Sequence, residues 1–213
     1  MELKELASAV EKGSVKKVKQ LTALALEEGY GVEEILNTGM IAPMGLVGEK
    51  FKRNEIYVPE MLVAARAMTA GMAILEPLMA DTGIKPLGKV VIGTVKGDLH
   101  DIGKNLVAMM MKGIGATVYD VGVDTPDETF VAKAEEVGAD IICISALLTT
   151  TMPTIESTIQ AFIKAGVRDK YYIMIGGAPV TQQFADEVGA DAYTSNASDA
   201  ATVAQKYLES KAE

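Results

Sequence analysis

Two different patterns of apolar and polar residues divide this chain near residue 81. Before that point apolar residues recur every three or four positions, which predicts four consecutive amphipathic helices. These helices are expected over residues 2–12, 14–29, 31–50 and 59–80. Ser14 stands where an N-cap is expected, and Pro59 falls in the first turn of the fourth helix. The first part of the chain is therefore predicted to form a small helical bundle.

A stretch with glycine and proline at residues 82–88 predicts a linker, and the pattern then changes to short runs rich in valine and isoleucine. The runs predicted as strands are residues 89–95, 116–121, 140–145, 171–175 and 190–193. A helical pattern follows each strand, so right-handed crossovers predict a doubly wound parallel sheet with the flavodoxin-like (Rossmann-like) order 2-1-3-4-5. The predicted α/β architecture has a four-helix cap domain at 1–81, a linker at 82–88 and an α/β domain at 89–213.

Ligands of such folds bind beyond the carboxyl ends of the strands, between the first and third strands. His100, the only histidine, follows the first predicted strand in the run Gly97-Asp98-Leu99-His100-Asp101-Ile102-Gly103. The polar run 145–151 follows the third strand, so the two loops are expected to meet. Gly176-Gly177 and residues 195–198 follow the fourth and fifth strands. Together these loops outline a slot for a long polar ligand rather than a compact substrate.

The spacing of Asp98 and His100 gives this loop a specific chemistry. A carboxylate two residues before a histidine can accept one ring N–H, which fixes the tautomer and makes the other nitrogen a better metal ligand. The pattern Asp98-x-His100-x-x-Gly103 also resembles the cobalamin-binding signature. A solvent-exposed loop histidine is the alternative for His100 taken alone, but the surrounding loops favour a metal ligand.

Composition narrows the function classes. A net charge of −9 and a pI near 4.8 argue against binding to nucleic acid or to an anionic membrane surface. The first ten residues mix charged and apolar side chains, so neither a signal peptide nor a membrane-spanning helix is predicted, and we expect a cytoplasmic protein. The single Cys143 lies in an apolar run and is expected to be a buried structural thiol. One histidine and one cysteine cannot form a zinc site.

Residues 84–208 resemble the cobalamin-binding module of methionine synthase and its relatives. The resemblance rests on the motif around His100, on Ser145-x-Leu147 and on Gly176-Gly177. Residues 48–60, Gly-Glu-Lys-Phe-Lys-Arg-Asn-Glu-Ile-Tyr-Val-Pro-Glu, are similar to the helical cap of that family. Chains with this pairing resemble corrinoid proteins that shuttle methyl groups from methanol, methylamines, betaines or methyl ethers, in one-carbon metabolism such as methanogenesis or acetogenesis.

The resemblance implies three catalytic residues. His100 would replace the dimethylbenzimidazole of the cofactor as the lower cobalt ligand, and is the only expected metal ligand. Asp98 would hold the distal nitrogen of His100. Thr151 stands where methionine synthase has the serine that continues this relay to solvent. Thr151 is also expected to cap the helix that begins at Met152.

The resemblance also implies a set of cofactor contacts. Those of the α/β domain are Gly97, Asp98, Leu99, His100, Asp101, Ile102, Gly103, Ser145, Leu147, Thr149, Gly176, Gly177 and Ala197. Gly103 would let the displaced nucleotide tail pass, and Ala197 would lie near the far end of the slot. Phe51 and Val58 would cover the upper, methyl-bearing face of the corrin, although Phe51 could instead simply fill the bundle.

The implied cofactor is cobalamin or a related corrinoid, in its methylcobalamin form. The chain would carry a methyl group on cobalt between a donor-specific methyltransferase and an acceptor methyltransferase that serves a folate, a pterin or a thiol, with a reductive activator as a third partner. It would be a carrier subunit without turnover alone. The alternatives are cobalamin storage or delivery and cobalamin sensing; the cap segment argues against an isomerase subunit.

Overall fold

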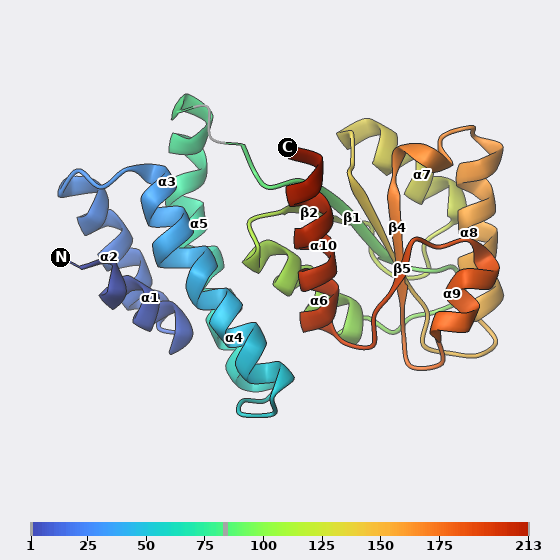
Figure 1. Cartoon of the computed structure of the whole chain (residues 1–213), viewed down its shortest axis with the longest axis horizontal. Helices are drawn as coiled ribbons and strands as arrows, with labels where there is room; N and C mark the ends of the chain where they lie inside the picture. The colour runs from blue at the N-terminus through green and yellow to red at the C-terminus, as the bar shows by residue number, and fades with distance from the viewer. Residues whose placement is uncertain (1, 83–84, 213) are drawn as a thin grey trace. The chain divides into compact units, whose positions relative to one another are not determined.

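The computed structural model describes residues 2–82 and 85–212, and the chain separates into two compact units (Figure 1). One unit comprises Met1–Pro86 together with Lys112–Gly115, and the other comprises Leu87–Met111 and Ala116–Glu213. The fourth helix extends to Thr82, the first residue of the predicted linker, and the first strand begins at Lys89. Gly83 and Ile84 of that linker lie outside the described residues.

All four predicted helices are present in the helical unit. Their elements are α1 (Leu3–Glu11), α2 (Val15–Glu27), the continuous series α3 (Val32–Glu34), η1 (Ile35–Ile41) and α4 (Ala42–Lys52), and α5 (Val58–Thr82). Ser14 occupies the predicted N-cap position of α2, although its side chain makes no capping hydrogen bond there.

A π-helical segment, η1, interrupts the third predicted helix. The backbone N–H of Ala42 donates to the carbonyl of Asn37, five residues back. Pro43 follows in the first turn of α4 and has no N–H, so it cannot make the α-helical bond to Gly39. The wider turn accommodates this missing donor. Gly39 also allows close packing, because a Cβ there would lie 2.6 Å from Leu6 Cδ2.

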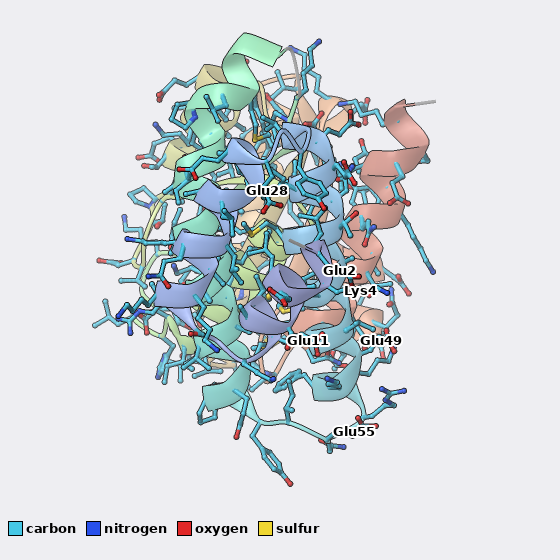
Figure 2. The ribbon with its side chains drawn as sticks, turned by 90° about the vertical axis from the view of Figure 1, so that its left-hand side faces the viewer. Glu2, Lys4, Glu11, Glu28, Glu49 and Glu55 are labelled. Carbon is cyan, nitrogen blue, oxygen red and sulfur yellow. The ribbon has the colours of Figure 1, made fainter. Side chains whose placement is uncertain are left out.

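The interior of the helical unit is apolar and its outside is charged. Fully buried side chains from α1, α2, η1 and α5 form the core: Leu6, Val18, Ile35, Met40, Met61 and Leu75. Charged side chains project outward, among them Glu2, Glu11 and Glu49 (Figure 2). Glu11 of α1 accepts from Lys50 of α4 at 2.7 Å. This distribution is that of a small water-facing bundle.

Within α5 the stretch Val58–Met79 is long and apolar enough to cross a membrane by length and composition, a feature that the sequence analysis did not single out. The core helix of a water-soluble bundle passes the same test. One side of α5 is buried, with Met61, Ala64 and Leu75 fully enclosed, and α5 packs against α2. We therefore interpret α5 as the core helix of the bundle.

The α/β unit contains the predicted five-stranded parallel sheet, in the order β2-β1-β3-β4-β5 (Figure 1). Its strands are β1 (Lys89–Thr94), β2 (Thr117–Asp120), β3 (Ile141–Ser145), β4 (Tyr172–Gly176) and β5 (Ala192–Tyr193). The helices of this unit are α6 (Ile102–Gly113), α7 (Asp127–Val137), α8 (Met152–Lys164), the short 3₁₀ helix η2 (Arg168–Lys170), α9 (Gln182–Val188) and α10 (Ala197–Ala212). The fold prediction is confirmed in class and in strand order.

Helices cover both faces of the sheet: α7, α8 and α9 lie on one face, and α6 and α10 lie on the other (Figure 1). Val91, Ile142 and Ile173, on neighbouring strands, pack with Phe130 of α7 and Phe162 of α8. A sheet buried on both faces explains the near-continuous apolar runs of its central strands. The register pairs Thr94 with Ser145 and Ser145 with Gly176, which aligns the carboxyl ends of the three central strands.

Candidate corrinoid site at the carboxyl end of the sheet

The loop between β1 and α6 carries the Asp98–His100 motif. Asp98 N–H donates to the Val95 carbonyl at 3.1 Å, which turns the chain just after the strand. Thr94 Oγ1 donates to the His100 carbonyl at 2.9 Å and fixes the far side of the loop to the strand end. The carboxyl end of β1 thus holds both ends of the segment from Asp98 to His100.

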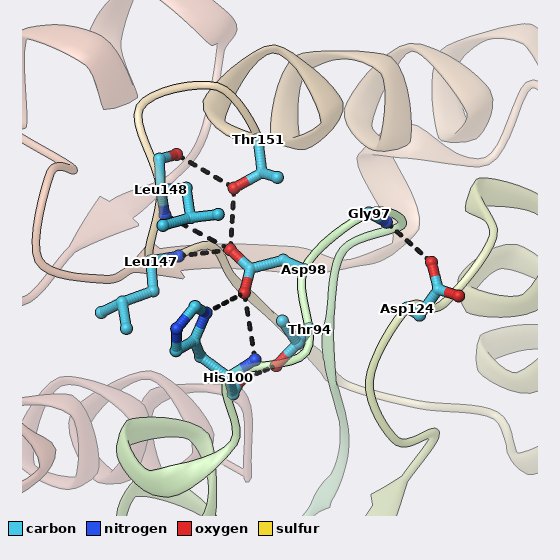
Figure 3. Close-up of polar contacts among 8 residues, drawn as sticks. All are labelled: Thr94, Gly97, Asp98, His100, Asp124, Leu147, Leu148 and Thr151. Carbon is cyan, nitrogen blue, oxygen red and sulfur yellow. Dashed lines mark hydrogen bonds and ion pairs between the residues drawn. The ribbon is translucent and has the colours of Figure 1, made fainter.

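Asp98 and His100 are in direct contact. Asp98 Oδ1 lies 2.7 Å from His100 Nδ1 and also accepts the His100 backbone N–H at 3.1 Å (Figure 3). The Asp98 side chain is fully buried, whereas the imidazole is 49% exposed. Among the residues that the structure describes, none hydrogen-bonds to Nε2 of His100. The contact expected from the spacing of these two residues is present.

The second carboxylate oxygen of Asp98 is held by the loop that follows β3. Asp98 Oδ2 accepts the Leu147 N–H at 2.7 Å, the Leu148 N–H at 3.3 Å and the Thr151 hydroxyl at 2.7 Å (Figure 3). Thr151 stands at the N-cap position of α8, but its side chain makes no capping bond. The expectation that Thr151 caps α8 is therefore wrong. Its hydroxyl faces Asp98 instead, and the loops after the first and third strands meet as predicted.

The hydrogen bonds around Asp98 determine which atom carries the proton shared between Asp98 and His100. Burial raises the pKa of Asp98, but hydrogen bonds from Leu147 N–H, His100 and Thr151 outweigh burial and hold that pKa well below its usual range. Asp98 is then ionised at neutral pH and can only accept hydrogen bonds. The proton between Asp98 and His100 consequently belongs to Nδ1, and the lone pair of Nε2 is available to a metal ion.

The expected glycines lie beside this network. A Cβ on Gly177 would collide with the carbonyl oxygen of Ala146, and the φ of Gly177 is +136°, which disfavours any side chain. Ala146 N–H donates to the Gly176 carbonyl at 3.2 Å. Backbone from the ends of β3 and β4 therefore forms one surface of the site, close to Ser145.

The remaining predicted residues of the α/β unit follow the carboxyl ends of its strands. Thr149 is exposed in the loop before α8, and Ala197 is buried at the start of α10. Gly103 lies in the first turn of α6 with open space where a Cβ would project. Asp101 accepts the Asn105 side-chain amide at 3.1 Å. Phe51 lies in the last turn of α4, and Val58 is the first residue of α5, so both belong to the helical unit.

Two polar residues near the motif were not singled out by the sequence analysis. Lys104, next to Gly103, is 4% exposed and forms an ion pair with Asp120 at the end of β2. Asp124, in the loop after β2, accepts the Gly97 N–H at 2.7 Å. A lysine in the first turn of a largely apolar helix is a weak signal, and nothing in the local sequence indicated the contact made by Asp124.

Large apolar side chains are exposed around the imidazole. Leu99 is 72% exposed, Ile102 is 75% exposed, and Leu147 is 40% exposed. Such exposure next to a metal-competent nitrogen indicates a ligand that combines a metal with a broad apolar surface. A corrin macrocycle with central cobalt has both properties.

Family models match both units. A model described as a B12 binding domain matches residues 88–204, and a second with the same description matches residues 2–76. The chain is 44% identical over 209 residues to the dimethylamine corrinoid protein of Methanosarcina barkeri, covering 97% of each chain. It is 42% identical, with the same coverage, to a corrinoid protein of Desulfitobacterium hafniense. The chain belongs to the corrinoid-protein family.

Solved structures agree with this assignment. A cobalamin-binding protein of Desulfitobacterium hafniense DCB-2 is 29% identical with a TM-score of 0.78, over 97% of this chain and 98% of that one. The methanol:cobalamin methyltransferase complex MtaBC of Methanosarcina barkeri contains a chain with 27% identity and a TM-score of 0.87, over 96% of this chain and 78% of that one.

The corrinoid protein binds cobalamin or a related corrinoid, and its residues fit that group. The donor set offers one half-exposed imidazole whose Nδ1 is held by a buried carboxylate, the arrangement that suits a single histidine ligand to a metal. The open space where a Cβ of Gly103 would project leaves room for a long tail at the start of α6. The site thus has exposed apolar side chains, one candidate ligand nitrogen and open space at the start of the following helix.

Proposed function

We propose that this corrinoid protein carries a methyl group between two methyltransferases. The relatives named for dimethylamine and the methanol:cobalamin methyltransferase complex support a donor-specific methyltransferase as one partner. An acceptor methyltransferase for a folate, pterin or thiol and a reductive activator complete the proposed system, which would be located in the cytoplasm. When bound, the corrinoid supplies a cobalt centre that accepts and gives up the methyl group.

The observation that carries this proposal is the bond between Asp98 Oδ1 and His100 Nδ1. His100 would hold cobalt through Nε2, and Asp98 would tune the electron-donating strength of that nitrogen. Thr151 would stabilise the charge on Asp98. Among the described residues no cluster of His, Cys, Asp and Glu could hold a second metal ion. Activation of the methyl donor is therefore assigned to a partner enzyme.

The proposed contacts of the cofactor come from both units of the chain. Leu99, Ile102 and Leu147 would meet its apolar lower surface, because these side chains are exposed beside His100. The nucleotide tail would run past Gly103 toward the slot formed by Gly97, Asp101, Ser145, Thr149, Gly176, Gly177 and Ala197. Phe51 and Val58 of the cap domain would cover the upper face, and residues 82–88 would link the two domains.

The first test asks whether His100 ligates cobalt. Protein labelled with nitrogen-15 histidine is reconstituted with cobalamin, and the electron paramagnetic resonance spectrum of the Co(II) state is recorded. Because the chain has one histidine, a change from the nitrogen-14 to the nitrogen-15 superhyperfine pattern assigns the ligand to His100. An unchanged pattern would remove His100 from the proposal.

The second test separates a methyl carrier from a storage or delivery protein. The reduced holoprotein is incubated anaerobically with a dimethylamine methyltransferase and dimethylamine, and in parallel with methanol, monomethylamine and betaine enzymes and their substrates. A carrier acquires the absorption spectrum of the methylated cofactor with at least one pair, and only when the enzyme is present. Failure with every pair, in protein that passes the first test, favours storage or delivery.

A further inference from the structure

The loop between β2 and α7 runs beside the strand that leads to the ligand histidine. Thr94 N–H donates to the Gly122 carbonyl at 2.9 Å, and Thr125 N–H donates back to the Thr94 carbonyl at 3.0 Å. Val95 and Thr125 form a parallel bridge beyond the end of β1. This loop is therefore tied to the segment from which the His100 loop departs.

Asp124, in this loop, makes hydrogen bonds to two consecutive residues of the motif, Gly97 and Asp98. Its Oδ1 accepts the Gly97 N–H at 2.7 Å, and its own backbone N–H donates to the Asp98 carbonyl at 2.9 Å. Figure 3 shows Asp124 on a ribbon opposite the Gly97 turn, on the far side of that turn from Leu147 and Thr151. Asp98 is thus held by two loops: through its backbone by the β2–α7 loop, and through its carboxylate by the β3–α8 loop.

The backbone conformation shows why the side chain at this position matters. Asp124 has a φ of +51° and Gly97 a φ of +86°, so both residues of this contact have a left-handed backbone conformation. Glycine adopts such angles without cost, and aspartate and asparagine are the residues that tolerate them best otherwise. What Asp124 adds over a glycine is the oxygen that accepts the Gly97 N–H.

We propose that Asp124 is a positioning residue for the cobalt ligand, acting through the Gly97–Asp98 peptide. With Gly97 held, the Asp98 carboxylate meets His100 Nδ1 and Leu147 N–H at the same time. Without the bond from Gly97 N–H to Asp124, the turn keeps its bonds to Val95 and to the Asp124 backbone but loses one restraint, so the carboxylate is held less firmly against both partners. This inference rests on the proposed role of His100 and concerns the strength of its bond to cobalt.

The test compares two variants that share the backbone preference and differ in the acceptor. Asp124→Asn keeps an acceptor oxygen and tolerates the left-handed angle, while Asp124→Gly tolerates the angle and has no acceptor. In cobalamin-loaded Co(II) protein, the fraction with histidine bound is measured from the nitrogen superhyperfine pattern. Loss of one hydrogen bond should lower the ratio of bound to unbound histidine about two- to tenfold in Asp124→Gly. Asp124→Asn should remain close to the parent.

A second readout separates positioning from simple stability. Weaker axial ligation makes the Co(II)/Co(I) potential of Asp124→Gly less negative than that of the parent, whereas Asp124→Asn should match the parent. A lower melting temperature of Asp124→Gly with an unchanged histidine-bound fraction and an unchanged potential would overturn the inference. If the parent itself shows no histidine coupling, the proposed ligand has failed instead, and the two failures remain distinguishable.

Discussion

Thr151 Oγ1 lies 2.7 Å from Asp98 Oδ2, although 53 residues separate the two in sequence. Their contact joins the loops after β1 and β3 at the switch point of the sheet. It also connects a buried carboxylate to the start of α8. A substitution at Thr151 should therefore alter the hydrogen bonding of His100 through Asp98, although Thr151 does not contact the imidazole.

Replacing Thr151 tests this connection. Thr151→Val keeps the shape and removes the donor to an ionised acceptor, so the free energy of unfolding of the apoprotein should fall by about 1.5–3 kcal/mol at pH 7. Thr151→Ser retains the hydroxyl and should lose less. Urea unfolding monitored by circular dichroism measures both.

The pH dependence of the Thr151→Val effect follows from the pKa of Asp98, which is lowered in the folded state. A lowered pKa adds stability above the unfolded value, near 4. That stability is lost as pH falls through the lower folded value. The difference between parent and Thr151→Val should thus be largest at neutral pH and shrink below about pH 4. A difference independent of pH would mean that Asp98 is not the partner.

Asp98→Asn tests the carboxylate itself. An amide that keeps its oxygen toward His100 presents an NH₂ group to the N–H donors of Leu147 and Leu148. The affinity of His100 for cobalt should fall about ten- to a hundredfold, as is usual when such a partner is removed. Asp186→Asn, on the surface of α9, makes the same chemical change away from the site and serves as the control. Equal histidine-bound fractions in Asp98→Asn and the control would exclude Asp98.

The ion pair between Lys104 and Asp120 predicts an asymmetric pair of variants. The Lys104 side chain is 3% exposed, while that of Asp120 is 40% exposed. Asp120→Asn leaves a buried ammonium without its counter-charge and should cost more stability, roughly 1–3 kcal/mol, than Lys104→Met. The double variant should recover part of that loss. Lys133→Ala removes an exposed pair with Glu136 and should change stability by less than about 0.5 kcal/mol.

Cys143 provides a probe of opening in the α/β unit. Burial raises the pKa of its thiol to about 12, on the central strand β3. The thiol is therefore almost entirely protonated at pH 8, so a thiol reagent should react only after the sheet opens. Bound cobalamin should slow the reaction further, because ligand binding stabilises the closed state. Rapid labelling of folded holoprotein would contradict the buried position.

The sequence predicted some parts of this molecule and not others for physical reasons. The strand order and the Asp98–His100 contact depend on local patterns, the apolar runs and a spacing of two residues, and both were predicted. The Thr151 hydroxyl was assigned to a helix cap as well, because its partner is chosen by the register of β1 against β3. Asp124 gave no signal, since its role depends on a left-handed turn that meets a distant loop. The π-helical turn before Pro43 was also missed, because the periodicity of apolar residues continues through it.

The proposed cap contact predicts a photochemical difference. If Phe51 covers the methyl-bearing face of the cofactor and the loops at Ser145 and Gly176 hold its tail, Phe51→Ala exposes that face to solvent without releasing the tail. Light breaks the carbon–cobalt bond, and a methyl radical that is no longer enclosed diffuses away more often than it recombines. The methylated Phe51→Ala protein should therefore lose its methyl group faster under constant illumination.

The control for this experiment is Leu24→Ala, which truncates another partly exposed apolar side chain of the helical unit, on α2. Melting temperatures of both variants show whether the bundle still folds. Faster photolysis in Phe51→Ala alone, with similar melting temperatures, supports a cap that must open before a partner can reach the cofactor. Equal photolysis rates in the parent and in folded Phe51→Ala would mean that Phe51 only fills the bundle.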